Sequence, residues 1–360
     1  MVSRGFTHED AYPYIAAPLI ALSLAASSVA FAQPADKVGK VEFPNSCSPA
    51  VQEKLLRGVA MLHSFYYSAT QKAFEEVAAE DNACAIAAWG YASILMSNPL
   101  QGIGASLKSA ELAQGAIDKG RKMGAKTQRE RDYLDAVAAY YEDFANRPER
   151  ARQVNRAKAY EALTAKYPDD DEAQIFYALY LAGTQTASDQ TYSAYLKAAS
   201  ILEKQFAKHP DHPGVAHYLI HSYDAPPIAA QGLPAARRYA AIAPDAPHAL
   251  HMPSHIFTRV GAWADSATTN RRSADYRGTE QRSRRCAARA GLHDLRLPAA
   301  RARRRRTQDL RGGPHPHRNQ PGARDRVLRA RGDAGALRYR ARRLARCDDA
   351  RAEPEQFPVH

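Results

Sequence analysis

Apolar residues recur at spacings of three and four along most of the chain, from Ala50 to about Asp275. The pattern is clear in QEKLLRGVAMLHSFYY, CAIAAWGYASILM, ERDYLDAVAAYYEDF and EAQIFYALYLAG, and this is the period of amphipathic α-helices. Short polar breaks such as KYPDDD, KHPDHP and IAPDAP separate the runs and supply helix stops and N-caps. No alternating run of β-branched residues competes with the helices, so the sequence predicts an all-α fold.

The breaks between helices also repeat. Pro210 and Pro244 occupy the same place in two similar junctions, and Pro168 precedes Pro210 by a longer interval that contains GTQTASDQ as an insertion. The interval from Pro210 to Pro244 matches the period of about 34 residues that is typical of one class of stacked helical hairpins. Two matches at the level of single residues also support a helical-hairpin repeat. They are a second-helix pattern that ends at Pro168 and the turn Gly261-Ala-Trp263.

On these residues, the chain over 48–275 resembles the tetratricopeptide-repeat proteins. It is most similar to exported bacterial members with LHSF, AWG, HYLIHSYD and HMPSHIFTR-like segments. The resemblance implies an α-solenoid of antiparallel helix pairs, wound into a right-handed superhelix whose concave groove binds a protein or peptide partner. Five side chains are candidates for lining the groove or packing between its helices: His63, Trp89, Tyr218, Asp224 and Trp263.

The N-terminus predicts an export signal. Residues 15–32, IAAPLIALSLAASSVAFA, form an apolar run that ends in small-x-small, which is typical of a signal peptide cleaved after Ala32. An uncleaved membrane anchor is the alternative, although the run is short for a membrane span. We therefore expect a periplasmic or cell-envelope protein with no membrane span after cleavage, in which residues 33–47 form an extension before the helical domain.

Export changes how the cysteines are interpreted. Cys47 and Cys84 each lie at the start of a predicted helix, and in an oxidising compartment an even pair is a disulfide candidate. In a stack of helical hairpins the starts of these two helices are neighbours, so a disulfide between them is geometrically reasonable. The alternative is two buried thiols.

The charge of the chain is concentrated at its C-terminal end. Residues 281–360 hold 22 Arg, no Lys and eight acidic residues, whereas the rest of the chain holds 28 basic and 30 acidic residues. Residues 276–360 also lose the helical period, which favours a low-order stretch translated from a shifted reading frame. The alternative is a genuine basic tail that binds nucleic acid through phosphate contacts. We expect no nucleic-acid partner, because the body of the protein is nearly neutral.

Two stretches, HYLIHSYD and HALHMPSH, each carry histidines four residues apart: His217 and His221, then His251 and His255. Corresponding histidines of the two stretches are separated by the same interval as the repeated prolines. If the two helices are equivalent elements of adjacent repeats, all four imidazoles converge, and zinc or another divalent ion would suit them. Pro253 argues against this, because a proline can begin a new helix and remove His251 from the first one.

Two functions remain open from the sequence. The first is an exported scaffold in which the histidines only pack or line the groove. The second is a metal-binding protein or metal-dependent hydrolase that uses His217, His221, His251 and His255, with Asp224 as a further ligand. No nucleophile-and-base motif supports catalysis without metal, so we expect a binding protein rather than an enzyme.

Overall fold

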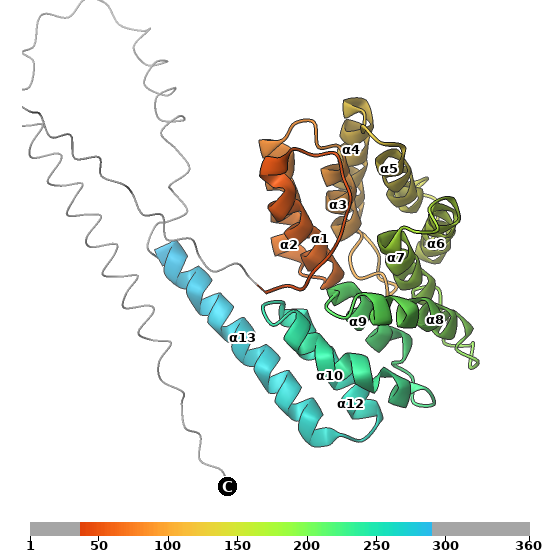
Figure 1. Ribbon diagram of the computed structural model, residues 1–360, viewed down its shortest axis with the longest axis vertical. Helices are drawn as coiled ribbons and strands as arrows, with labels where there is room; N and C mark the ends of the chain where they lie inside the picture. The colour runs from red at the N-terminus through yellow and green to blue at the C-terminus, as the bar shows by residue number, and fades with distance from the viewer. Residues whose placement is uncertain (1–36, 290–360) are drawn as a thin grey trace, which may run out of the picture. The chain divides into compact units, whose positions relative to one another are not determined.

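The computed structural model describes residues 37–289, and within that range every regular element is helical (Figure 1). The all-α prediction is confirmed. The short 3₁₀ helices are η1 (Pro49–Val51) and η2 (Ala229–Gly232). The α-helices are α1 (Gln52–His63), α2 (Tyr67–Glu80), α3 (Ile86–Leu95), α4 (Leu107–Met123), α5 (Gln128–Tyr141), α6 (Glu149–Lys166), α7 (Asp171–Ala182), α8 (Ser193–Lys208), α9 (Pro213–Ser222), α10 (Leu233–Ile242), α11 (Pro247–His251), α12 (Pro253–Arg259) and α13 (Trp263–Arg289).

Helices that follow one another in the chain pack against one another, from α1 through α10, and α13 then covers α11 and α12 (Figure 1). Contacts also join alternate helices, such as α1 with α3 and α7 with α9. In addition, α1 packs against α9, which comes much later in the chain. This contact brings the end of α1, at His63, next to the first histidine stretch.

The extended segment before η1 ties the two ends of the helical body together. The Lys37 amide donates to the Asp245 carboxylate (2.7 Å), and the Asp245 amide donates back to the Lys37 carbonyl (3.2 Å). The Lys40 amide donates to the Asp211 carbonyl (3.1 Å). Residues 37–46 therefore run across the junctions that precede α9 and α11.

The junctions cap the helices that follow them, as their sequences predict. The Asp170 side chain accepts from the Ala173 amide at the start of α7, and the His212 ring accepts from the Val215 amide at the start of α9. Thr127 and Glu130 form a capping box on α5. Such caps satisfy backbone N–H groups that the first helical turn leaves free.

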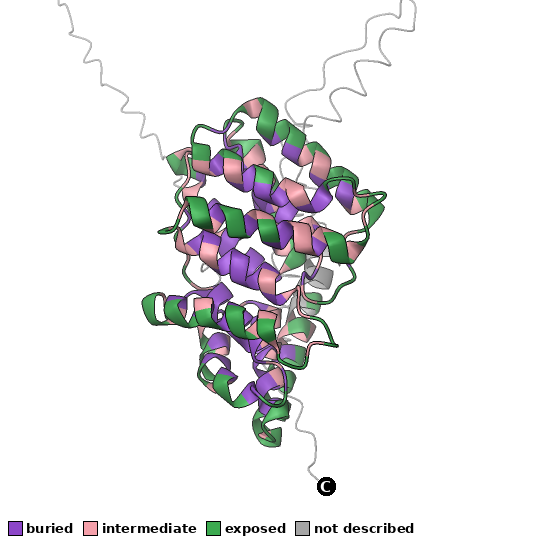
Figure 2. Ribbon diagram, turned by 90° about the vertical axis from the view of Figure 1, so that its right-hand side faces the viewer, coloured by how far each residue is buried: buried purple, intermediate pink, exposed green. Residues whose placement is uncertain are grey.

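The core is unusually aromatic. Trp89 is fully buried, stacks on Phe43 with ring centroids 4.8 Å apart, and donates from Nε1 to the Tyr160 hydroxyl (2.8 Å). Individual helices carry both buried and exposed stripes (Figure 2), which is the pattern that their amphipathic sequences require. The predicted Cys47–Cys84 disulfide is confirmed and joins the segment before η1 to the junction before α3.

One predicted boundary differs from the structure. The helical repeat was expected to end near residue 275, but α13 continues to Arg289, so the first residues of the predicted tail are helical. Arg and Ala are good helix formers even without an apolar period, which explains why loss of the period did not end the helix. The predicted signal peptide and the tail beyond Arg289 lie outside the described residues. Within 37–289, no helix is both long and apolar enough to cross a membrane.

Candidate metal centre

The two histidine stretches occupy equivalent helices. Helix α9 begins at Pro213 and helix α11 at Pro247, which repeats the interval between corresponding histidines, and each helix carries a histidine as its fifth residue. Proline is favoured at the first helical position because its missing N–H is not needed there. Rings from the two stretches face one another, with centroids 4.9 Å apart for His217 and His248 and 6.2 Å apart for His221 and His255. The two stretches therefore lie side by side, but the ligand nitrogens that gather belong to His217, His221 and His248 rather than to the four predicted histidines.

Pro253 breaks the second helix without separating its histidines. Helix α11 ends at His251 and α12 begins at Pro253, but Met252 between them keeps helical angles (φ −54°, ψ −37°). Pro253 has no backbone N–H, so one helical hydrogen bond is missing, but the chain keeps a nearly helical course at this point. As a result, the Nε2 atoms of His251 and His255 lie 3.2 Å apart. The expectation that Pro253 would move His251 away is wrong.

His251 and His255, which we call the His251 pair, have their Nδ1 atoms bonded to oxygen. His255 Nδ1 lies 2.8 Å from the Asp224 carboxylate, and His251 Nδ1 lies 2.7 Å from Asn270 Oδ1. The Asn270 amide is oriented by its own nitrogen, which donates to the Ser266 carbonyl (3.1 Å). Both oxygens are acceptors, so both Nδ1 atoms carry a proton. When both rings are neutral, the two Nε2 atoms that face each other both present lone pairs.

A second set, the His217 group, consists of His217, His221 and His248, whose ligand nitrogens all lie within 4.8 Å of one another. His217 Nδ1 donates to the His63 carbonyl (2.6 Å), which leaves its Nε2 as a lone pair, 3.1 Å from His221 Nε2. His248 Nε2 is buried and has no hydrogen-bond partner. Buried polar atoms are rarely left unpaired, so this nitrogen is available to a ligand.

Burial keeps these rings neutral. It is the main cause that lowers the pKa of His217 and of His221 well below the ordinary value, and the neighbouring imidazoles add to the effect. Burial and the adjacent rings likewise lower the pKa of His248 to about 3. Neutral imidazole is the form that binds metal ions. The three rings of the His217 group are therefore ready to coordinate a metal at neutral pH.

The spacing fits a tetrahedral site. With Zn–N bonds of about 2.0–2.1 Å, two ligand nitrogens on one tetrahedron lie roughly 3.3 Å apart. The two Nε2–Nε2 distances, 3.1 Å and 3.2 Å, match one edge of such a tetrahedron and also an N–H···N hydrogen bond, while the three nitrogens of the His217 group lie within 4.8 Å of one another. The Nδ1–H groups that donate to Asp224, Asn270 and the His63 carbonyl match the outer hydrogen bonds that orient metal-binding histidines.

A third cluster, His63, Glu172 and His212, is completely different in its hydrogen bonding. Glu172 accepts from His63 Nε2 (2.9 Å) and from His212 Nε2 (3.0 Å), and all three side chains are buried. His212 Nδ1 accepts from the Val215 amide (3.3 Å), so the proton of this ring must sit on Nε2. That proton blocks metal binding at Nε2. The cluster is a satisfied buried network, and we assign it a structural role.

The other predicted residues divide between the centre and the core. Asp224, considered as a metal ligand, accepts from His255 Nδ1 and from Arg259 Nε (2.9 Å), so its carboxylate already has two partners in α12. His63, Trp89 and Tyr218 pack in the core, which is one of the two roles expected of them. Trp263 does not: it is 67% exposed, because side chains lean toward the helix N-terminus and this residue begins α13.

Sequence reasoning missed two members of the centre, His248 and Asn270. His248 was visible as a third histidine in HALHMPSH, three residues before His251 and hence on the same helical face. Asn270 lies several helical turns beyond His255, in a stretch without other candidate ligands. Only the packing of α13 on α11 and α12 reveals its role.

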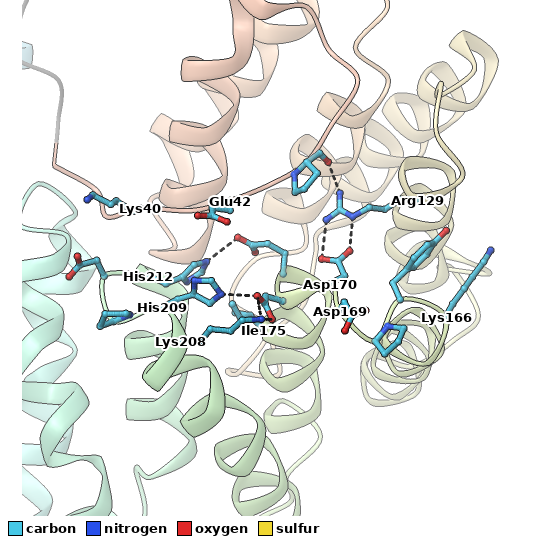
Figure 3. A pocket seen from close by; sticks show the side chains of 17 residues that line it. Lys40, Glu42, Arg129, Lys166, Asp169, Asp170, Ile175, Lys208, His209 and His212 are labelled. Atoms are coloured by element: carbon cyan, nitrogen blue, oxygen red, sulfur yellow. Dashed lines mark hydrogen bonds and ion pairs between the residues drawn. The ribbon is translucent and has the colours of Figure 1, made fainter.

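Another cavity lies away from the histidines of α9, α11 and α12. A cleft of about 670 Å³ is bounded by the segment near Lys40 and by the junctions before α7 and α9 (Figure 3). Most of its charges are paired with one another: Arg129 binds the Asp170 carboxylate and the Pro44 carbonyl, while Lys208 and His209 both bind Asp171. Lys40, Glu42 and Asp169 also line the cleft and make no ion pair within residues 37–289, so its charges are only partly engaged with one another.

Comparisons with known proteins add no family to this picture. No protein-family model matches the chain, and no curated protein gives a significant match. What the centre does must therefore be argued from its own geometry.

Proposed function

We propose that the protein binds a transition-metal ion at the histidines of α9, α11 and α12. One observation carries the proposal: in the His251 pair, both Nδ1–H groups are committed to oxygen acceptors, yet the two Nε2 atoms face each other at 3.2 Å. Two lone pairs at this distance repel unless a cation lies between them. A metal ion between these atoms removes the repulsion, and a metal ion in the neighbouring His217 group would provide a partner for His248.

The donor set indicates which ions fit. Imidazole nitrogens suit zinc, copper and nickel, whereas magnesium and calcium prefer oxygen. In the His217 group, three nitrogens leave a fourth tetrahedral position open, as in zinc sites that bind an exogenous ligand. When bound, the metal would supply a Lewis acid at that position. His217, His221 and His248 would hold it, and the His63 carbonyl would orient the ring of His217.

The test is metal analysis of the full chain, produced in medium supplemented with zinc, copper or nickel and dialysed before measurement. We expect stoichiometric retention of one of these ions. His251→Gln should weaken retention, whereas His209→Gln, on a ring that pairs with Asp171 away from the centre, should not. Failure of the wild-type protein to retain any of the three ions would refute the proposal.

A proton is the competing cation for the His251 pair, since a charged His255 would still donate to Asp224. Nitrogen chemical shifts of the imidazoles distinguish the two explanations. A metal-bound pair shows two neutral rings whose Nε2 resonances change on chelation. A proton-bridged pair shows one imidazolium in the metal-free protein and no change when metal is added.

A second proposal, an exported tetratricopeptide-like scaffold that binds a protein or peptide, rests on different features. The consecutive packing of helices and the repeated interval between α9 and α11 favour a solenoid, and the disulfide favours an oxidising compartment. The cleft near Lys40 gives such a partner a site with polar and apolar surfaces. In this protein, however, the contact between α1 and α9 fills part of the space that an open superhelix leaves free.

Two measurements test the scaffold. N-terminal sequencing of the exported protein should begin at Gln33, and any retained leader contradicts cleavage after Ala32. A photo-crosslinking residue in place of Lys166, at the cleft, should capture one defined partner in the cell envelope. The same residue in place of the exposed Lys72 should not, and equal capture from both positions argues against a specific cleft.

A further inference from the structure

A cavity of about 160 Å³ lies beside the proposed metal centre. His248 and His251 form one side of it, Phe65, Tyr66 and Pro247 supply apolar surface, and Arg277 of α13 lines it as well. It is thus bordered by one histidine from the His217 group and one from the His251 pair. A ligand in this cavity would contact the centre directly.

The cavity is lined by a cation that lacks a counterion. Among the residues that the structure describes, Arg277 makes no ion pair, although several other arginines have one. Arg277 and His248 both line the cavity, and Arg277 is exposed to solvent. A ligand that enters the cavity can therefore meet the guanidinium and the ring of His248 together.

The size and chemistry of the cavity restrict its ligand. An engineered cavity of about 150 Å³ accommodates benzene, so a molecule of six to nine non-hydrogen atoms, roughly, is the upper limit here. Aromatic walls favour an apolar body, and a single guanidinium favours a planar carboxylate, to which it can donate two parallel hydrogen bonds. Ser273 adds no free donor, because its hydroxyl donates to the Pro247 carbonyl (3.1 Å).

We propose that this cavity binds a small carboxylate, such as a short aliphatic or aromatic acid, as the exogenous ligand of the metal, with Arg277 pairing its carboxylate. The proposal rests on the metal centre proposed above. One carboxylate oxygen occupies the open coordination position of the His217 group, and Arg277 holds the other. The centre then recognises a charged small molecule in addition to the metal.

The experiment uses the full chain loaded with Co²⁺, whose visible absorption reports changes in coordination. Titration with acetate and with benzoate should change the spectrum in a saturable manner. Acetamide, which has nearly the shape of acetate but no charge, should not. Arg277→Gln should weaken acetate binding about tenfold, as expected from the loss of one charge-assisted hydrogen-bonded contact, while leaving the cobalt content unchanged. Arg271→Gln, on the same helix but away from the cavity, is the matched control and should behave as wild type.

The outcomes separate the two proposals. A chain that retains none of cobalt, zinc, copper and nickel overturns both the metal centre and the carboxylate site. A chain that takes up cobalt but shows no saturable change with acetate or benzoate overturns the carboxylate site alone. Equal acetate affinity in wild type and Arg277→Gln also overturns it, and tighter binding of inorganic phosphate than of benzoate overturns the assignment to carboxylates.

Discussion

Glu172→Gln tests whether the buried His63–Glu172–His212 network is held by charge and hydrogen bonding rather than by shape. Gln has almost the same shape as Glu, so the substitution creates no cavity. It replaces one acceptor oxygen by an NH₂ group, however, and both imidazoles donate to Glu172. His212 cannot change tautomer, because its Nδ1 already accepts from the Val215 amide. His63 must then adapt, at the expense of the Tyr218 hydroxyl (3.0 Å).

The magnitude follows from counting these groups. One charge-assisted hydrogen bond worth about 1.5–3 kcal/mol is lost, and one buried polar group is left unsatisfied at a cost of about 1–3 kcal/mol. Removal of a buried charge offsets part of this sum. We therefore expect the free energy of unfolding to fall by about 2–4 kcal/mol. For a helical body of this size the midpoint of thermal unfolding should fall by roughly 4–16 °C.

The pH dependence provides an internal check. Burial acts to raise the pKa of Glu172, but the two imidazoles outweigh it and hold this pKa well below its ordinary range. A carboxyl whose folded pKa is lowered stabilises the protein fully above its unfolded pKa of about 4.3, and this contribution is lost as pH falls toward the folded pKa. The difference between wild type and Glu172→Gln should therefore be constant from pH 5 to 7 and shrink in more acidic solution.

Urea unfolding followed by circular dichroism measures both effects. Glu161→Gln is the control, because Glu161 makes a surface ion pair with Lys197, and exposed pairs contribute little. If Glu172→Gln were as stable as this control, or if the difference grew at low pH, the proposed protonation of the network would be wrong.

Three further predictions concern the metal centre and the disulfide. Asp224→Asn should lower metal affinity about 10–100-fold by weakening the hydrogen bond to His255; isothermal titration with Zn²⁺ checks this, and unchanged affinity would show that Asp224 does not orient the ring. Affinity of the His217 group should stay nearly level between pH 8 and pH 6, because the lowered pKa values keep protons from competing; a steep fall within that range would contradict neutral ligands. Replacing Cys47 and Cys84 by Ser removes the cross-link between positions with a sequence separation of 37, and the free energy of unfolding should fall by about 3–4 kcal/mol in the chain-entropy model. Urea unfolding with and without reductant measures this loss. A loss that persists equally in reductant would point to packing instead.

The sequence predicts the local features of this fold well. Helices and their junctions depend on residues within a few positions, such as the Asp170 and His212 caps, and these signals are legible in a single chain. The repeated interval in the sequence also predicts that His217 and His251 occupy equivalent helices. Repeats stack side by side, so equivalence in sequence becomes proximity in space. The proximity of the two histidine stretches follows from this.

Features that depend on distant packing were not predictable. The His63 carbonyl that fixes the tautomer of His217 comes from α1, far earlier in the chain, and Asn270 comes from a helix whose apolar period is weak. Asp224 was expected to act with the histidines of α9, but it accepts a hydrogen bond from His255 of α12 instead. Periodicity assigns a residue to a face of its helix, but it does not say which other element covers that face.

The protein contains its own control for the interpretation of the histidines. At the Glu172 network, every ring nitrogen has a complementary partner, and a carboxylate accepts both N–H groups. Histidines that only pack are expected to look like this, because unpaired buried polar groups are costly. In the His251 pair, two Nε2 atoms face each other at 3.2 Å, and in the His217 group His248 Nε2 has no partner. A cation between the two Nε2 atoms completes the His251 pair. In the His217 group burial opposes a proton, so a metal ion is the cation that we propose there.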